Sequence, residues 1–296
     1  MSKEQTTRFG VESPSKSEGR PYSGTTRPFL RWAGSKRKQL PTLSRFWNTD
    51  FTRYVEPFMG SACLCFELKP KNALLGDINY DLVRTFLAVR DHPQAVANRL
   101  ANIPRGRHSY YSIRSQQLSE MDAADAAARF IFLNRYCFNG LYRTNEAGQF
   151  NVPFAPAGTG RLATAADLHV VSKALKSCKI KHADFESILA RTREGDLVYL
   201  DPPYAVGNRR VFRQYGPSSF GLHDLQRLAE SLASMDARNV KFVLSYADCA
   251  EATEYFHQWP RRKMFIQRNI AGFGGKRRRA GEVLISNCFP GGMSHN

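Results

Sequence analysis

The chain has 296 residues, which is enough for one large domain or for a core domain with a smaller domain inserted into it. Its 43 lysines and arginines outnumber its 26 aspartates and glutamates and give a formal net charge of +17, so we expect a polyanionic partner such as nucleic acid. No apolar run approaches the ~20 residues of a membrane span, and the 6 cysteines show no metal-ligand spacing. The sequence therefore predicts a cytoplasmic protein with reduced thiols, without membrane contact and without a metal site.

The N-terminal part of the chain changes character near Pro28. Residues 1–27 are rich in Ser, Thr, Gly, Lys and Arg with few apolar side chains, which predicts a disordered basic tail. Apolar residues and a glycine turn follow in residues 28–36, and Ser35 is placed to cap a helix that runs to about Trp47. A turn that leads into a helix in this way is suited to binding a small ligand or a phosphate.

A strand, a glycine turn and a helix are predicted from residue 54 to about residue 68, and a second apolar run ends at Asp77, 17 residues after Gly60. Nucleotide-like cofactors use this arrangement, with the acid on a ribose hydroxyl, so Asp77 is a ribose-binding candidate. The loop lacks a complete Gly-x-Gly-x-x-Gly pattern, which favours S-adenosylmethionine over a dinucleotide. The alternative is that Asp77 caps the following helix.

From residue 81 the pattern becomes helical, with helices predicted at 81–89, 93–103, 110–118 and 123–133. The next segment, 134–154, interleaves aromatic residues with Arg and Asn and contains glycine turns, as is typical of a hairpin that contacts bases and phosphates. We expect Asn139 and Asn145 to contact DNA, and we interpret 81–180 as an inserted target-recognition domain. A purely structural hairpin is the alternative.

The stretch 196–204 gives the strongest chemical signal. Residues 197–200 fit a buried parallel strand, and Asp201 stands where this strand would end. The Asp201 carboxylate and the Pro202 carbonyl are two acceptors suited to the exocyclic amine of a nucleobase, and Tyr204 offers an aromatic face for a base swung out of a duplex. The sequence thus predicts methylation of such an amine, against the alternative of a strand that ends in a proline turn.

The α/β pattern continues to the end of the chain. Helices are predicted near 184–190 and at 223–237, and strands at 241–245, 264–270 and 282–287. If the strand at 241–245 is parallel to the one before Asp201, both end at the same edge of the sheet. A glycine-rich loop between the last two strands carries Lys276, Arg277 and Arg278, which we expect to contact the phosphate backbone of DNA.

Together these residues resemble the Dam-like family of N6-adenine DNA methyltransferases, from about Pro28 to Phe289. The most specific match is the hairpin at 134–154. The resemblance implies a seven-stranded, Rossmann-like S-adenosylmethionine-dependent methyltransferase domain over 28–80 and 181–290, with a mainly helical target-recognition domain inserted at 81–180 and a short tail at 291–296. It also implies direct methyl transfer to a flipped-out adenine in double-stranded DNA, and we expect a monomer.

The resemblance assigns roles at matching positions. The catalytic motif corresponds to Asp201, Pro202 and Tyr204, and the residues expected at the cofactor are Trp32, Lys36, Phe58, Gly60, Asp77 and Asp201. Residues expected at the DNA are Arg31, Phe138, Leu141, Arg143 and Pro153, with Arg143 as a guanine-reading arginine and Phe138 as a wedge in the opened stack.

Three positions depart from the family pattern. Ala62 replaces the second glycine of the cofactor loop, Phe138 replaces a tyrosine, and Arg31 replaces a base-reading lysine but can still donate twice to guanine. The expected target is GATC. The alternatives are methylation of cytosine N4 or of an RNA adenine, and a catalytically silent DNA-binding protein, which the departure at Ala62 suggests.

Overall fold

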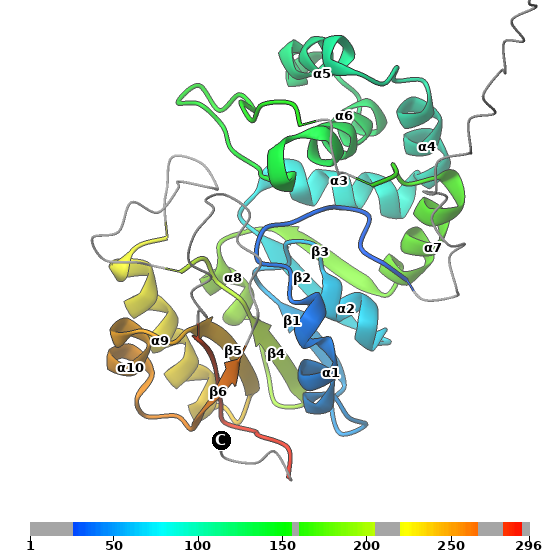
Figure 1. Cartoon of the computed structure of the whole chain (residues 1–296). Helices are drawn as coiled ribbons and strands as arrows, with labels where there is room; N and C mark the ends of the chain where they lie inside the picture. The colour runs from blue at the N-terminus through cyan, green and yellow to red at the C-terminus, as the bar shows by residue number, and fades with distance from the viewer. Residues whose placement is uncertain (1–25, 156–159, 205–219, 266–280, 292–296) are drawn as a thin grey trace, which may run out of the picture.

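A central sheet organises the chain, of which the computed structural model describes residues 26–155, 160–204, 220–265 and 281–291. Within these ranges seven strands pair in the order β3-β2-β1-β4-β5-β7-β6 (Figure 1). The strands are β1 (Arg53–Glu56), β2 (Ala73–Asp77), β3 (Cys178–His182), β4 (Asp196–Leu200), β5 (Lys241–Ala247), β6 (Arg261–Phe265) and β7 (Gly281–Ser286). The α/β fold expected from the sequence is confirmed.

The strand order places a topological switch point between β1 and β4. Strands β3, β2, β1, β4 and β5 are parallel, and the chain builds outward from β1 in one direction and from β4 in the other. Ligands of open α/β sheets bind outside the carboxyl ends of the strands at such a point. Strand β7 runs antiparallel to β5, so its first residues lie at this same edge.

Both faces of the sheet are covered, which explains the continuous apolar runs in its strands. Successive residues of β4 point to opposite sides: Leu197 and Tyr199 belong to one buried cluster, and Val198 and Leu200 to the other. The first cluster includes side chains from α1 (Leu40–Leu43) and α2 (Cys63–Leu68), and the second those from α8 (Phe185–Leu189), α9 (Leu222–Ala237) and α10 (Ala250–Phe256).

A helical layer lies above the carboxyl edge of the sheet in Figure 1 and falls between β2 and β3 in the sequence. It consists of α3 (Tyr80–Asp91), α4 (Pro93–Ala101), α5 (Arg107–Ser115), α6 (Ala123–Tyr136) and α7 (Ala165–Leu175). Local capping defines these helices: the side chains of Asn79, Asp122 and Thr164 accept backbone N–H groups in the first turns of α3, α6 and α7. Helix α6 contacts α3, α4 and α5 and is the centre of the layer.

Some predicted boundaries require correction. The single helix expected from Ser35 to Trp47 is instead two 3₁₀ turns on either side of α1. Pro41 lies in the first turn of α1 and has no backbone N–H, so it cannot donate the α-helical hydrogen bond that would join α1 to the preceding turn. The expected domain boundary after residue 180 falls inside β3, which pairs with β2 over its whole length. The strand expected at 264–270 begins earlier, as β6, and residues 266–270 lie outside the described ranges.

Some expectations concern residues outside the described ranges, namely nearly all of the N-terminal tail, Lys276, Arg277 and Arg278, and residues 292–296. None of the helices described is both long and apolar enough to span a lipid bilayer.

Candidate active site at the carboxyl edge of the sheet

Two of the residues expected at the cofactor, Gly60 and Asp77, meet where β1 and β2 end. The backbone N–H of Gly60 donates to Asp77 Oδ2 at 3.1 Å, and the N–H of Asn79 donates to Asp77 Oδ1 at 2.9 Å. Asp77 therefore fastens the glycine loop, which comprises residues 57–62 and joins β1 to α2, to the end of β2. It does not cap α3, because the Asn79 side chain accepts the Leu82 N–H and serves as the cap.

The glycine loop contains two residues with left-handed backbone, Gly60 and Ala62, with Ser61 between them. Gly60 has φ +45°, and a Cβ at this position would lie 2.7 Å from Trp32 Cδ1. Ala62 has φ +51°, and its N–H donates to the carbonyl of Met59 at 2.6 Å before α2 begins at Cys63. The loop keeps a left-handed bend although alanine, rather than glycine, stands at the second position.

Desolvation controls the electrostatics of two carboxyl groups beneath this loop. Burial raises the pKa of Asp77 to about 6, against the opposing effect of the Asn79 and Gly60 amides and of His182. Burial raises the pKa of Glu56 well above its ordinary value, and the nearby Asp201 and Asp77 charges add to this rise in its pKa. Glu56 Oε2 has no hydrogen-bond partner among the described residues. Burial therefore favours the neutral form of Glu56, which adds no further negative charge between the two aspartates.

Asp201 follows β4 directly, and a buried lysine pairs with it. Lys36 Nζ lies 2.9 Å from Asp201 Oδ1 and 3.5 Å from Glu282 Oε1, and it donates to the Tyr204 hydroxyl at 3.1 Å. Burial lowers the pKa of Lys36, but its attraction to Asp201 and the interactions with Tyr204 outweigh burial, so its pKa is raised. The lysine is therefore charged at neutral pH and holds residues 26–39, the N-terminal segment, against the loop that follows β4.

The Tyr204 ring is held on two sides. Its centroid is 5.0 Å from that of Tyr246 in an edge-to-face arrangement, and Lys36 Nζ lies 5.5 Å from its centroid. Tyr246 lies on β5, which is parallel to β4, so both strands end at the same edge as expected. Phe58, in contrast, stacks on Phe185 of α8 with ring centroids 5.4 Å apart, so its ring packs toward the α8 side.

Arg31 is held against the hairpin by Asn134. The Arg31 N–H donates to Asn134 Oδ1 at 2.8 Å, and Asn134 Nδ2 donates to the Arg31 carbonyl at 2.6 Å. A Cβ on Gly140, in the 3₁₀ turn of the hairpin, would lie 2.6 Å from Arg31 Cβ. Two segments that are about one hundred residues apart in the sequence therefore form one surface.

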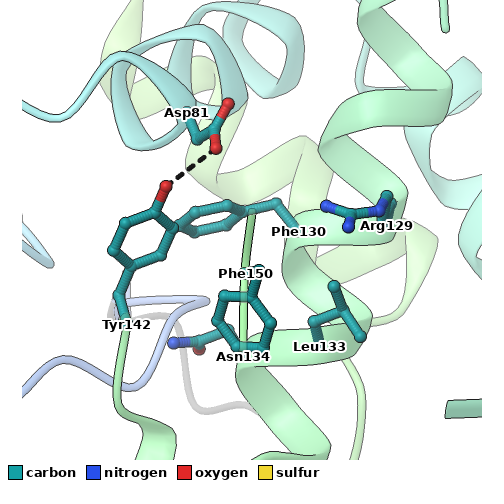
Figure 2. A pocket seen from close by; sticks show the side chains of 7 residues that line it. All are labelled: Asp81, Arg129, Phe130, Leu133, Asn134, Tyr142 and Phe150. Atoms are coloured by element: carbon teal, nitrogen blue, oxygen red, sulfur yellow. Dashed lines mark hydrogen bonds between the residues drawn. The ribbon is translucent and has the colours of Figure 1, made fainter. Parts of the chain in front are cut away.

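An aromatic cluster packs beneath the surface that Arg31 and the hairpin form. Figure 2 shows Tyr142, Phe130 and Phe150 around a small cavity, with the Tyr142 hydroxyl donating to Asp81 Oδ2 at 2.8 Å. The Tyr142 ring also stacks on Trp32, with centroids 6.2 Å apart. The base of the hairpin is thus packed against both α3 and the segment that covers the glycine loop.

Side chains of the hairpin differ in how strongly the hairpin itself holds them. Arg143 Nε donates to Asn151 Oδ1 at 2.7 Å, which orients the guanidinium. The Asn145 side chain both donates to Gln149 Oε1 at 3.1 Å and accepts the Gln149 N–H at 2.9 Å, so it closes the turn. Phe138, in contrast, is 46% exposed. The remaining candidates Asn139 and Pro153 are exposed, and Leu141 is half-buried.

The sequence reasoning missed several residues that the structure brings into the site: Glu282, Gln39, Asn134 and Asn151. Glu282 was not selected from the sequence because it lies at the start of a strand, whereas the selected acids, Asp77 and Asp201, lie at strand ends. A prediction that the last strand runs antiparallel to its neighbour would have placed Glu282 at the same edge of the sheet as Asp201. Within the described residues, no cluster of His, Cys, Asp or Glu side chains is arranged to hold a metal ion.

Comparison with known proteins identifies the family. The model of the D12 class N6 adenine-specific DNA methyltransferases matches residues 32–269. Type II methyltransferase M1.LlaDCHI of Lactococcus lactis subsp. cremoris is 30% identical over 270 residues, which cover 88% of this chain and 95% of the relative. Type II methyltransferase M.MjaIII of Methanocaldococcus jannaschii is 29% identical over 285 residues, with 88% and 99% covered.

The DNA adenine methylase of Escherichia coli is 29% identical over 263 residues, which cover 87% of this chain and 94% of the relative. The match to the family model begins at Trp32 and includes residues 201–204, and the relatives are matched over nearly their whole length. The chain therefore belongs to the D12 class of N6 adenine-specific DNA methyltransferases and is an enzyme that methylates adenine in DNA.

Proposed function

We propose that the chain transfers the methyl group of S-adenosylmethionine directly to N6 of an adenine that is flipped out of duplex DNA, and that its target is GATC. The observation that carries this proposal is the meeting of Asp201 and Tyr204 with the glycine loop and Asp77 at the switch point of the sheet. Cofactor, acceptor base and catalytic carboxylate would then share one edge of the sheet.

The residues around the end of β2 fit S-adenosylmethionine. Asp77 presents a fastened carboxylate for the ribose hydroxyls, and Ile78 beside it is 60% exposed, so an apolar surface is available to a flat adenine ring. Trp32 covers the glycine loop from the other side. When bound there, the cofactor would supply an electrophilic methyl group on its sulfonium.

The acceptor amine would be held by the chain itself. The Asp201 carboxylate and the Pro202 carbonyl accept the two hydrogens of the adenine amine, which favours a nucleophilic lone pair and offsets the positive charge that develops on nitrogen. Tyr204 stacks on the base. Exposed Phe138 fills the gap that the base leaves in the duplex.

The expected target is tested by mapping methylated bases after incubation with S-adenosylmethionine and unmethylated DNA of mixed sequence. We expect N6-methyladenine confined to GATC. Arg143→Ala should lower discrimination against the wrong base by about 10- to 100-fold, because a bidentate contact to guanine is lost. Arg193→Ala, an exposed arginine beside the opposite end of β4, is the control.

The outcome also separates the alternatives. N6-methyladenine in another motif would contradict the target assignment and the role of Arg143. Methylation of cytosine or of RNA adenine instead would replace the proposed acceptor. The left-handed bend that the loop keeps at Ala62 favours a working cofactor site over a silent binder.

Cofactor affinity should depend on pH through Asp77. With a pKa of about 6, this group is protonated below that pH and then loses an acceptor for the ribose hydroxyls. The dissociation constant for S-adenosylhomocysteine should therefore rise about tenfold as the pH falls from 7 to 5. Calorimetric titration across this range measures the effect. Asp77→Asn should bind more weakly with little pH dependence, and an equally steep profile in that variant would refute the assignment.

We also propose that the enzyme acts as a monomer. Asp201, Asp77, Arg31 and the hairpin that the site requires all come from one chain. Light scattering of the free enzyme at micromolar concentration tests this, and a stable dimer would contradict it.

A further inference from the structure

Glu282 is a buried carboxylate, 2% exposed, at the start of β7. It pairs in register with Ala247 at the end of β5, which places it at the same edge of the sheet as Asp201. A carboxylate that is removed from water needs partners for both oxygens. Glu282 finds them in the candidate active site.

Contacts with three described residues hold the Glu282 side chain. Its Oε1 accepts a hydrogen bond from the Tyr204 hydroxyl at 3.0 Å, and the same atom lies 3.5 Å from Lys36 Nζ. Its Oε2 accepts a hydrogen bond from Gln39 Nε2. Glu282 therefore joins the N-terminal segment to the loop that follows β4, and it holds the tip of the tyrosine expected to stack on the base.

The position of the lysine between two carboxylates has a chemical consequence. Lys36 Nζ is closer to Asp201, at 2.9 Å, than to Glu282, at 3.5 Å. An acceptor amine that donates to Asp201 competes with this ammonium for the carboxylate. A buried ammonium that lost its carboxylate would be strongly disfavoured, unless a second carboxylate stood within reach.

We propose that Glu282 is a positioning residue for methyl transfer, which takes over the Lys36 ammonium when the acceptor amine docks on Asp201 and holds the Tyr204 hydroxyl in place. The inference rests on the proposed function and extends it. Glu282 touches neither the base nor the cofactor in this scheme. It acts through Lys36 and Tyr204. By accepting the Lys36 ammonium, it leaves the Asp201 carboxylate available to the acceptor amine.

The test is Glu282→Gln, which keeps the shape of the side chain and removes its charge. We expect the single-turnover rate of methylation to fall about 10- to 100-fold, because both the lysine and the tyrosine lose a fixed position. Asp196→Asn is the matched control: Asp196 is also buried and paired with an arginine, Arg53, but at the opposite end of the sheet. This control should lose stability and keep a rate close to that of the wild type.

A second readout separates positioning from stability. DNA in which purine replaces the target adenine lacks the exocyclic amine. When this base docks, the Lys36 ammonium therefore does not have to pass from Asp201 to Glu282. The preference of the enzyme for adenine over purine at this position should be smaller in Glu282→Gln than in the wild type. Asp196→Asn should keep the wild-type preference, because a purely structural change does not depend on the amine.

The inference is overturned if Glu282→Gln matches the wild type or Asp196→Asn in both the rate and the adenine preference. If the glutamine variant does not fold, Glu282→Asp is used instead, because it keeps the negative charge but moves it away from Lys36 and Tyr204 by one methylene group. The same two readouts, the methylation rate and the adenine preference, then decide. A wild-type enzyme without N6-adenine methylation would contradict the proposed function itself. An active wild type with an insensitive Glu282→Gln would contradict only the role of Glu282.

Discussion

Asp201→Ala is expected to lower the rate of methyl transfer by about three orders of magnitude while the fold and most of the DNA affinity remain. In the proposed mechanism the Asp201 carboxylate is the acceptor that polarises the amine, and removal of such a group from a preorganised site has an effect of about this size. Lys36 would keep Glu282 and Tyr204 as partners, so the variant leaves no orphaned buried cation. Single-turnover methylation with saturating enzyme measures the effect.

The matched control for this experiment is Asp248→Ala. Asp248 follows β5, as Asp201 follows β4, and it also pairs with a lysine, Lys263, at 3.0 Å. Its loss should leave the rate nearly unchanged. A near-normal rate in Asp201→Ala would refute the catalytic assignment, and an equal loss in both variants would show only that the sheet edge is sensitive to charge.

Gly60→Ala should lower the free energy of unfolding by about 2–4 kcal/mol, since the left-handed backbone disfavours a side chain and the new methyl group would overlap Trp32. The indole has little room to move, because it stacks on Phe130 and Tyr142. Affinity for S-adenosylhomocysteine should fall as well, because the loop that Asp77 fastens is displaced. Urea unfolding and calorimetric titration measure the two effects.

Gly148→Ala provides the comparison. Gly148 has φ +74°, also left-handed, but a Cβ there would meet no atom within 4 Å. This variant should lose only about 1 kcal/mol of stability, from backbone strain alone, and keep its cofactor affinity. The difference between the two variants isolates the contact with Trp32. Equal losses of stability would mean that the contact is easily relieved.

The elements that rest on local signals could be predicted from the sequence. The apolar run before Asp201 gave β4, the glycine turn before Asp77 gave β1, α2 and β2, and helical periodicity gave α3 to α6 with boundaries correct to within a few residues. A buried strand and an amphipathic helix each leave a pattern within ten or fifteen residues, which a reader of the sequence can detect.

Relations between distant segments left no such pattern. The clamp between Arg31 and Asn134 joins residues 103 positions apart, and the pairing of Lys36 with Glu282 depends on the direction in which β7 runs. In β3, buried Cys178 and Ile180 alternate with exposed lysines, but the strand has only five residues, and no strand is predicted there from the sequence. Tertiary packing decided these features, and local propensity did not.

If Arg31 and the hairpin contact DNA as expected, the clamp between Arg31 and Asn134 also limits how target specificity can be exchanged between relatives. Arg31 belongs to the N-terminal segment, yet its backbone is held by α6, and its Cβ lies against the position of Gly140. A chimera that transplants residues 81–180 alone would pair a foreign hairpin with the native Arg31. The unit to be exchanged is therefore discontinuous, and a functional graft must carry the segment around Arg31 together with the hairpin that holds it.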